Sequence, residues 1–265
     1  KAARKITGNK EIVEFPFHFY DLNAKANYRI NSKNRVYLSG YLGRDVFSYA
    51  TDPKNQSRFN WGNYTGPLRW NHLFSQKLFS NFTLLASNYD YLLDNELTVG
   101  REEKTFAFEY DAFVKDYTFR ADFGYYLNQN NTLRFGLKTT RHDFNVGKVD
   151  GRQDTIKFQL KMPEVNSIES AIYLSNEQTV NDHLTLKYGL RYSLFQNIGP
   201  ARVNLVNDRY EVTGQKAYER GDIYHTYSGF EPRLGLNYTF SKKHSVKASY
   251  SRTRQYLLIA SNSST

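Results

Sequence analysis

The sequence contains no cysteine, which excludes disulfide bonds, thiolate metal sites and a cysteine nucleophile. It also contains no apolar run of the ~18 residues that a membrane-spanning helix needs, and its mean hydropathy is −0.68. Neither absence excludes a membrane β-barrel, because only alternate residues of its strands face lipid. The first residues carry no charged and then apolar leader, so we expect any export signal to lie outside this sequence.

Aromatic residues are abundant, since Tyr, Phe and Trp make up 16% of the 265 residues. The 36 Lys and Arg residues against 26 Asp and Glu give a net charge of +10. This composition excludes a disordered chain. Basic charge with aromatics would also fit nucleic-acid binding, but Lys and Arg are spread along the chain rather than gathered in one stripe. We therefore expect no nucleic-acid partner.

Apolar and polar residues alternate strictly in several segments, which predicts β-strands with one apolar face. The alternation is clearest at residues 22–30, 184–194 and 232–240. Between residues 106 and 125 the apolar positions change from even to odd, which predicts a β-bulge near Lys115 and Asp116. We expect an all-β protein of about ten strands. They lie near residues 17–30, 35–48, 64–75, 81–93, 104–127, 132–143, 168–179, 183–196, 228–240 and 244–256.

The connections between these strands alternate in length. Short turns follow the odd-numbered strands, and long loops follow the even-numbered ones near residues 49–63, 94–103, 144–167 and 197–227. Short turns at one end and long loops at the other are typical of outer-membrane barrels. The polar faces carry charge as a hydrated lumen does, and Tyr and Phe gather near strand ends as an interfacial girdle does. These features predict an antiparallel up-and-down transmembrane β-barrel, with a soluble sandwich or barrel as the alternative.

The order of turns and loops also predicts where the chain ends lie. If the short turns are periplasmic, residues 1–16 begin outside the cell and residues 256–265 end outside it. A self-contained barrel normally keeps both termini on the periplasmic side, and an open sheet edge cannot face lipid. We therefore expect residues 1–265 to form one partial barrel domain whose remaining strands lie outside this sequence.

Three stretches resemble a known family when they are taken in order. They are Tyr188-Gly189-Leu190-Arg191-Tyr192, then Gly229-Phe230-Glu231-Pro232-Arg233-Leu234-Gly235-Leu236-Asn237-Tyr238, then Ser245-Val246-Lys247-Ala248-Ser249-Tyr250-Ser251-Arg252. Their order and spacing are similar to the mid-barrel region of TonB-dependent outer-membrane receptors. The resemblance implies a 22-stranded barrel with a plug domain in its lumen, in the outer membrane of a Gram-negative bacterium. It also implies contact with outer-membrane lipid and an energising TonB-type inner-membrane complex, and a surface lipoprotein is a candidate partner.

The function implied by this resemblance is active transport of a nutrient ligand. Iron chelates, vitamins, glycans and peptides are all imported by the family, and the choice among them stays open. A passive porin or a scaffold barrel is the first alternative. A soluble β-rich binding protein is the second.

No catalytic constellation stands out, and the six histidines are dispersed without metal-binding spacing. We expect no enzymatic activity, no metal and no cofactor. The candidate residues facing the lumen and the plug are Arg191, Glu231 and Arg233, which would also fit a cross-strand ion pair. The candidate ligand contacts in the extracellular loops are Trp61, Tyr64, Tyr210, Tyr218 and Tyr224.

Overall fold

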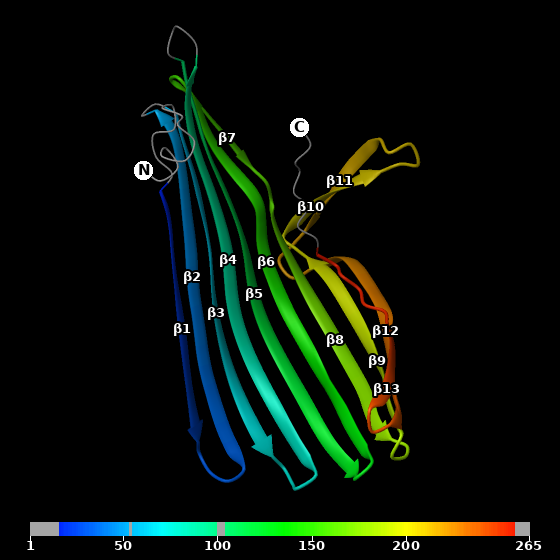
Figure 1. Ribbon diagram of the computed structural model, residues 1–265. Coiled ribbons are helices and arrows are strands. Elements are labelled where there is room, and N and C mark those ends of the chain that lie inside the picture. The colour runs from blue at the N-terminus through cyan, green and yellow to red at the C-terminus, as the bar shows by residue number, and fades with distance from the viewer. Residues whose placement is uncertain (1–15, 53–54, 100–103, 258–265) are drawn as a thin grey trace.

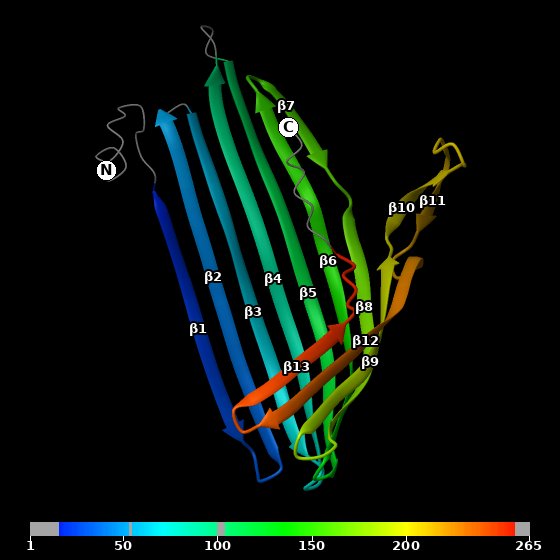
Figure 2. The same ribbon diagram turned by 45° about the vertical axis from the view of Figure 1, so that its right-hand side comes forward.

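The chain folds into a curved antiparallel sheet, which is seen from two directions (Figure 1, Figure 2). The structure is a computed structural model and describes residues 16–52, 55–99 and 104–257. Within those ranges no helix is long and apolar enough to cross a bilayer. The predicted locations of the chain ends concern residues 1–16 and 256–265, of which 1–15 and 258–265 lie outside the described residues. The strands are β1 (Phe17–Arg29), β2 (Asn34–Asp52), β3 (Asn55–Leu73), β4 (Leu78–Val99), β5 (Lys104–Asn128), β6 (Asn131–Gln153), β7 (Ile156–Lys161), β8 (Glu164–Thr179), β9 (Leu184–Ile198), β10 (Ala201–Val206), β11 (Val212–Tyr218), β12 (Ile223–Ser241) and β13 (His244–Ser251).

Strands that follow one another along the chain are neighbours in the sheet. One 11-stranded sheet runs in the order β1-β2-β3-β4-β5-β6-β8-β9-β12-β13, with β7 paired to the end of β6. The other two strands, β10 and β11, pair only with each other and project as a hairpin (Figure 1). The ten strands of the main path agree with the predicted strands in order and type, so the predicted up-and-down architecture is confirmed.

The short turns lie together at the lower end of the sheet in Figure 1. Each opens with an Asn or Ser whose side-chain oxygen accepts the backbone N–H two residues later, a contact that stabilises tight turns. These residues are Asn31, Ser75, Asn128, Asn181 and Ser241. The local sequence therefore closes each of these hairpins, and the predicted short turns are confirmed.

The register divides the side chains between two faces, because residues opposite each other in paired strands share a face. The convex face is apolar, with Leu84 56% exposed and Ile172 63% exposed. A row of rings follows this face near the short turns. Their neighbouring centroids are 4.4 to 6.4 Å apart in the series Trp70, His72, Phe74, Phe82, Phe123 and Phe135. An apolar convex surface edged by aromatic rings is the surface that a barrel presents to lipid.

The long loops expected at the other end are mostly strand. β2 and β3 are separated only by residues 53–54, and β4 and β5 only by residues 100–103. The two remaining segments contain β7 and the β10–β11 hairpin. The prediction of long loops was therefore wrong over most of residues 49–63, 94–103, 144–167 and 197–227. The apolar alternation that identifies a strand in the sequence is present only where one face of the sheet is apolar. These strand ends lie above that apolar band of the convex face, so the alternation did not identify them as strand.

The predicted bulge near Lys115 and Asp116 is also wrong. β4 and β5 pair over their whole shared length without a register shift. The irregularity lies on β6, which advances three residues where β5 advances two, from Asp111 to Phe113. The even apolar residues of upper β5 and the odd ones of lower β5 therefore face opposite sides of the sheet. The change of parity marks the edge of the apolar band, not a bulge.

Candidate functional site

The concave face of the sheet is polar and carries an excess of basic side chains. We call the inner wall the concave-face residues from the level of Thr118 down to the short turns. It holds eleven basic and four acidic side chains, a net charge of +7 from 11 − 4. The basic residues are Lys25, Arg29, Arg35, Arg69, Arg120, Arg134, Lys138, Lys187, Arg191, Arg233 and Lys247, and the acidic ones are Asp122, Glu169, Glu177 and Glu231.

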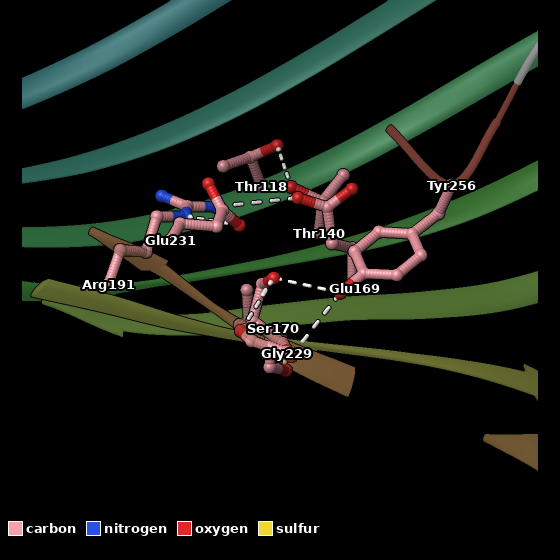
Figure 3. A network of polar contacts seen from close by, with 10 residues as sticks. Thr118, Thr140, Glu169, Ser170, Arg191, Gly229, Glu231 and Tyr256 are labelled. Carbon is pink, nitrogen blue, oxygen red and sulfur yellow. Dashed lines mark hydrogen bonds and ion pairs between the residues drawn. The ribbon is translucent and has the colours of Figure 1, made fainter. Parts of the chain in front are cut away.

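Two of the predicted lumen residues form one ion-pair network (Figure 3). Arg191 on β9 lies opposite Glu231 on β12, and its Nε is 3.6 Å from Glu231 Oε1. Its Nη2 is 3.5 Å from Glu169 Oε1 on β8. Glu231 is only 4% exposed, so its charge needs the guanidinium beside it. The sequence predicted the shared face, and the structure adds that one arginine joins three strands.

The segment after β13 crosses the inner wall beside this network, a contact that the sequence analysis missed. Tyr256 Oη lies 2.8 Å from Ser193 Oγ, and the Tyr256 ring stacks on Phe195 with centroids 5.3 Å apart. Ser193 is fully buried, and its small side chain lets the tyrosine approach the sheet. The sequence feature that could have indicated this departure from the sheet is Pro232 on β12. A proline has no N–H, so it cannot continue the hydrogen-bond ladder between β12 and β13.

A buried aspartate–histidine pair lies one row above the inner wall. His142 Nδ1 is 2.7 Å from Asp116 Oδ1, and the histidine is 8% exposed. His142 was grouped with the dispersed histidines in the sequence, and only the cross-strand register brings it to Asp116. Among the described residues, no group of three or more His, Cys, Asp or Glu side chains could hold a metal ion.

Arg233 is not part of the Arg191 network. It lines a groove of about 560 Å³ on the lower inner wall, together with Arg134 and Lys187. These last two share a single carboxylate, since Glu177 lies 3.8 Å from Arg134 and 3.1 Å from Lys187. Within the described chain no carboxylate reaches Arg233, and its side chain is exposed. The groove therefore presents uncompensated positive charge to the inside of the curved sheet.

Above the level of Tyr117 the two faces exchange character. The concave face becomes aromatic, and several rings are in contact: Phe47 with Phe59 at 6.0 Å and Tyr91 with Tyr110 at 6.1 Å between centroids. Burial is the main cause that raises the pKa of the Tyr91 phenol, with Tyr89 and Tyr110 adding to it. We call this surface the aromatic face. Its rings include Phe47, Tyr49, Phe59, Trp61, Tyr89, Tyr91, Phe106, Phe108, Tyr110 and Phe158.

The convex side of the same strand ends is charged. Arg44 Nη2 lies 2.6 Å from Asp90 Oδ2, and Arg44 Nη1 lies 2.8 Å from Asn60 Oδ1. Further along, Arg152 pairs with Glu96 at 3.5 Å. A charged outer surface is not stable in contact with lipid, so the convex face at this level lacks the character that lipid contact requires. The aromatic rings on the other side lie inside the curve of the sheet.

The predicted ligand contacts are divided between different surfaces. Trp61 lies within β3 on the aromatic face, in register with Tyr91. Tyr64 also lies within β3, but on the convex side opposite Leu42, and it is 48% exposed. Both are strand residues rather than the loop residues that were expected. Tyr64 lies at the border of the apolar band, which is the position of an interfacial girdle.

The other three tyrosines belong to the region of the β10–β11 hairpin. Tyr210 lies at the tip, 88% exposed, with φ at 61°. Asn207 holds this tip, because its side-chain oxygen accepts the backbone N–H groups of Arg209 and Glu211. Tyr218 and Tyr224 contact each other at its base, with centroids 5.5 Å apart. Their contact with a ligand stays a prediction.

Comparison with known proteins gives a family and a fold. The family profile described as "TonB dependent receptor-like, beta-barrel" matches residues 8–255. BauA, the ferric preacinetobactin receptor from Acinetobacter baumannii, is similar at a TM-score of 0.59 and 12% identity, over 91% of this chain and 40% of that chain. The closed form of Fiu, the ferric-catecholate import receptor from K12 E. coli, is similar at a TM-score of 0.59 and 12% identity, over 91% and 44% of the two chains.

A third solved structure, the ferric citrate transporter FecA, is similar at a TM-score of 0.56 and 12% identity, over 89% of this chain and 36% of that chain. Similarity at this level of identity shows the fold alone. The chain spans less than half the length of each of these three structures. Among curated protein sequences, none matches it.

Proposed function

Because the chain belongs to the family of TonB-dependent receptor-like β-barrels, we propose that it forms part of the wall of a receptor that imports a nutrient ligand. Family membership places the barrel in the outer membrane of a Gram-negative bacterium, among receptors and transporters rather than enzymes. The apolar convex face then contacts lipid, and the concave face lines the lumen. Family membership also removes the soluble alternative that the sequence had left open.

The exchange of character between the two faces carries this proposal. Above the membrane the convex side is charged and the concave side is aromatic. Within the membrane the arrangement is the reverse, because lipid requires an apolar convex face. A wall in which rings face inward and charges face outward suits the capture of a ligand with apolar or stacking surfaces. Trp61, Tyr91 and Tyr110 are the residues proposed to make that contact.

Passage through the membrane follows along the inner wall. In this scheme the lumen is filled by a plug domain, which a TonB-type complex displaces, and a surface lipoprotein is a further candidate partner; all three are proposed on the family likeness. Arg191 and Glu231 pair with each other and brace the wall, whereas Arg233 is exposed and is proposed to face the plug.

The proposal is tested by ligand binding to the full-length receptor. The protein is titrated with a panel of iron chelates, vitamins, oligosaccharides and peptides while tryptophan fluorescence is recorded. For the compound that binds, replacing Trp61 by Ala is expected to weaken affinity by roughly thirtyfold, the loss of about 2 kcal/mol that a buried aromatic anchor contributes.

The matched control is Tyr64→Ala, which removes a ring of similar size from the same strand but from the opposite face. Its affinity is expected to equal that of the wild type. Equal losses in the two variants would contradict ligand capture on the aromatic face. A passive porin would bind no member of the panel and would conduct ions without a closed state.

A further inference from the structure

The convex face carries a hollow at the upper border of its apolar band. Its volume is about 430 Å³, and we call it the apolar groove. Small residues form its floor: a Cβ placed on Gly66 would have only Ser39 O within 4.0 Å, apart from its own chain neighbours. Larger apolar side chains from β3, β4, β5 and β8 border the groove, and they are Leu68, Leu84, Tyr117, Phe119 and Ile168. The groove is therefore an open apolar hollow on the side of the sheet that the proposed function places against lipid.

A second groove adjoins the first on the side away from the short turns, and it is polar. Its volume is about 570 Å³, and we call it the basic groove. Arg141 lines both grooves, so the two meet at its side chain. The other charged residues of the basic groove are Lys161, Glu164 and Arg220, which gives three basic side chains and one acidic one.

Two arginines of the basic groove have donors available for a ligand. Nε of Arg141 donates to Oδ1 and Oδ2 of Asp143 at 2.9 and 3.2 Å, which orients the guanidinium. In the part of the chain that the structure describes, the Arg141 side chain donates no other hydrogen bond, and Arg220 forms no ion pair. Guanidinium groups with free N–H donors bind phosphate oxygens strongly and in a fixed orientation.

The order of the two grooves along the wall matches the two ends of a lipid molecule. The apolar groove lies within the apolar band, at the depth of acyl chains, and the basic groove lies beyond it, at the depth of headgroups. Basic pockets at a membrane surface bind phosphate-bearing headgroups. A soluble anion would leave the apolar groove unused, and a lipid without phosphate would leave the arginines unpaired.

We propose that the two grooves together bind one anionic lipid, with an acyl chain in the apolar groove and a phosphate of the headgroup held by Arg141 and Arg220. The inference rests on one part of the proposed function, namely that the convex face contacts the lipid of the outer membrane. It goes further than that contact, because it names a site for a single lipid, the charge of its headgroup and the residues that hold it. Both grooves lie between β3 and the start of β12, inside the two edges of the main sheet.

The test measures lipid binding to the full-length protein in detergent by native mass spectrometry, with diphosphoryl lipid A as the probe. Gly66→Leu fills the apolar groove, and Arg220→Gln removes a phosphate contact. The matched controls are Ala24→Leu, which adds the same side chain to the convex face on β1, and Arg209→Gln, which removes an exposed arginine at the tip of the β10–β11 hairpin. Unfolding of each variant in urea confirms that the barrels are folded.

The wild type is expected to bind one lipid A molecule more tightly than dioleoylglycerol, which has acyl chains but no phosphate. Arg220→Gln should weaken the affinity for lipid A by roughly tenfold, as the loss of one charge-assisted hydrogen bond predicts, and leave the affinity for dioleoylglycerol unchanged. Gly66→Leu should weaken the binding of both lipids by roughly tenfold, because the leucine takes the space of the acyl chain. Both controls should bind as the wild type does.

Three results would overturn the inference. Equal losses in Arg220→Gln and Arg209→Gln would show a diffuse attraction between a basic protein and an anionic lipid. Equal affinities of the wild type for lipid A and dioleoylglycerol would show apolar contact without recognition of phosphate. Full affinity in Gly66→Leu, together with displacement of lipid A by inorganic phosphate, would show a site for a small anion. If Gly66→Leu does not fold, the two arginine variants and the comparison of lipids still decide.

The proposed function is judged separately by the nutrient titration, because Trp61 lies on the opposite face of the sheet from both grooves. A receptor that binds a nutrient but has no preference for lipid A would overturn this inference alone. A protein that binds lipid A as described but no nutrient would overturn the proposed function alone.

Discussion

Arg191 supports the inner wall because, within the described part of the chain, it is the one cation that two carboxylates share. Glu169 and Glu231 lie on the strands at either side, and their side chains are 23% and 5% exposed. Without the guanidinium, two negative charges would remain close together and poorly hydrated. The energetic cost of breaking a mostly buried ion pair exceeds the worth of the pair itself, because the remaining charge loses its only compensation.

Replacing Arg191 by Met is therefore expected to destabilise the folded protein by about 3 kcal/mol. Replacing Glu231 by Gln should cost less, about 1 kcal/mol, because Arg191 keeps Glu169 as a partner. The free energy of unfolding is measured by urea titration of the full-length protein in lipid vesicles. Equal and small losses in the two variants would show that the network is solvated and does not brace the wall.

For single residues, the sequence predicted only the face of the sheet, which follows from odd or even position in a strand. Parity placed Arg191, Glu231 and Arg233 on one face, and the structure agrees. It could not show that Arg191 pairs with Glu231 while Arg233 stays apart, because pairing depends on side-chain reach across strands. It also missed Tyr64, whose position on the convex face follows from the register of β3 and not from its distance to a turn.

At the scale of elements, hairpin geometry was predictable where two independent signals agreed. Apolar alternation and an Asn or Ser at the turn both marked the lower ends of the strands, and the five short turns were found. The upper ends carried only one signal, because the faces exchange character there. Residues 49–63 and 94–103 were therefore assigned to loops, although backbone pairing continues through most of them.

Close packing between β4 and β5 depends on a glycine on the inner wall. A Cβ at Gly124 would lie 2.3 Å from Cζ of Phe79, so the ring covers the space that a side chain would take. Gly124→Ala is expected to destabilise the protein by about 1–3 kcal/mol through overpacking. In a Phe79→Ala background the same substitution should be neutral or slightly stabilising, because alanine reduces the entropy of the unfolded chain.

The measurement is a double-mutant cycle of unfolding free energies for these two positions. A coupling of roughly 1–2 kcal/mol is expected for side chains in direct contact. Additive effects would contradict the packing of Phe79 over Gly124.

At the scale of the whole molecule, the wall consists of two zones along its height. In the membrane zone the convex face is apolar and the inner wall carries net positive charge. In the upper zone the convex face is charged and the concave face is aromatic. Lipid dictates the first arrangement, and the second is free of lipid, so the upper zone is where ligand capture is proposed.

The most direct test of this account is a spin-label scan along β5. Residues 1–265 contain no cysteine, so once any cysteine elsewhere in the full-length protein is replaced, single cysteines introduced from residue 105 to residue 125 each report one position. Accessibility to oxygen measures lipid contact, and accessibility to a water-soluble nickel chelate measures water contact. We predict high oxygen accessibility at the odd positions from Tyr117 to Tyr125, and at no position above Lys115. Oxygen maxima at the even positions from Phe106 to Val114 would contradict the account, because the aromatic face would then be buried in lipid.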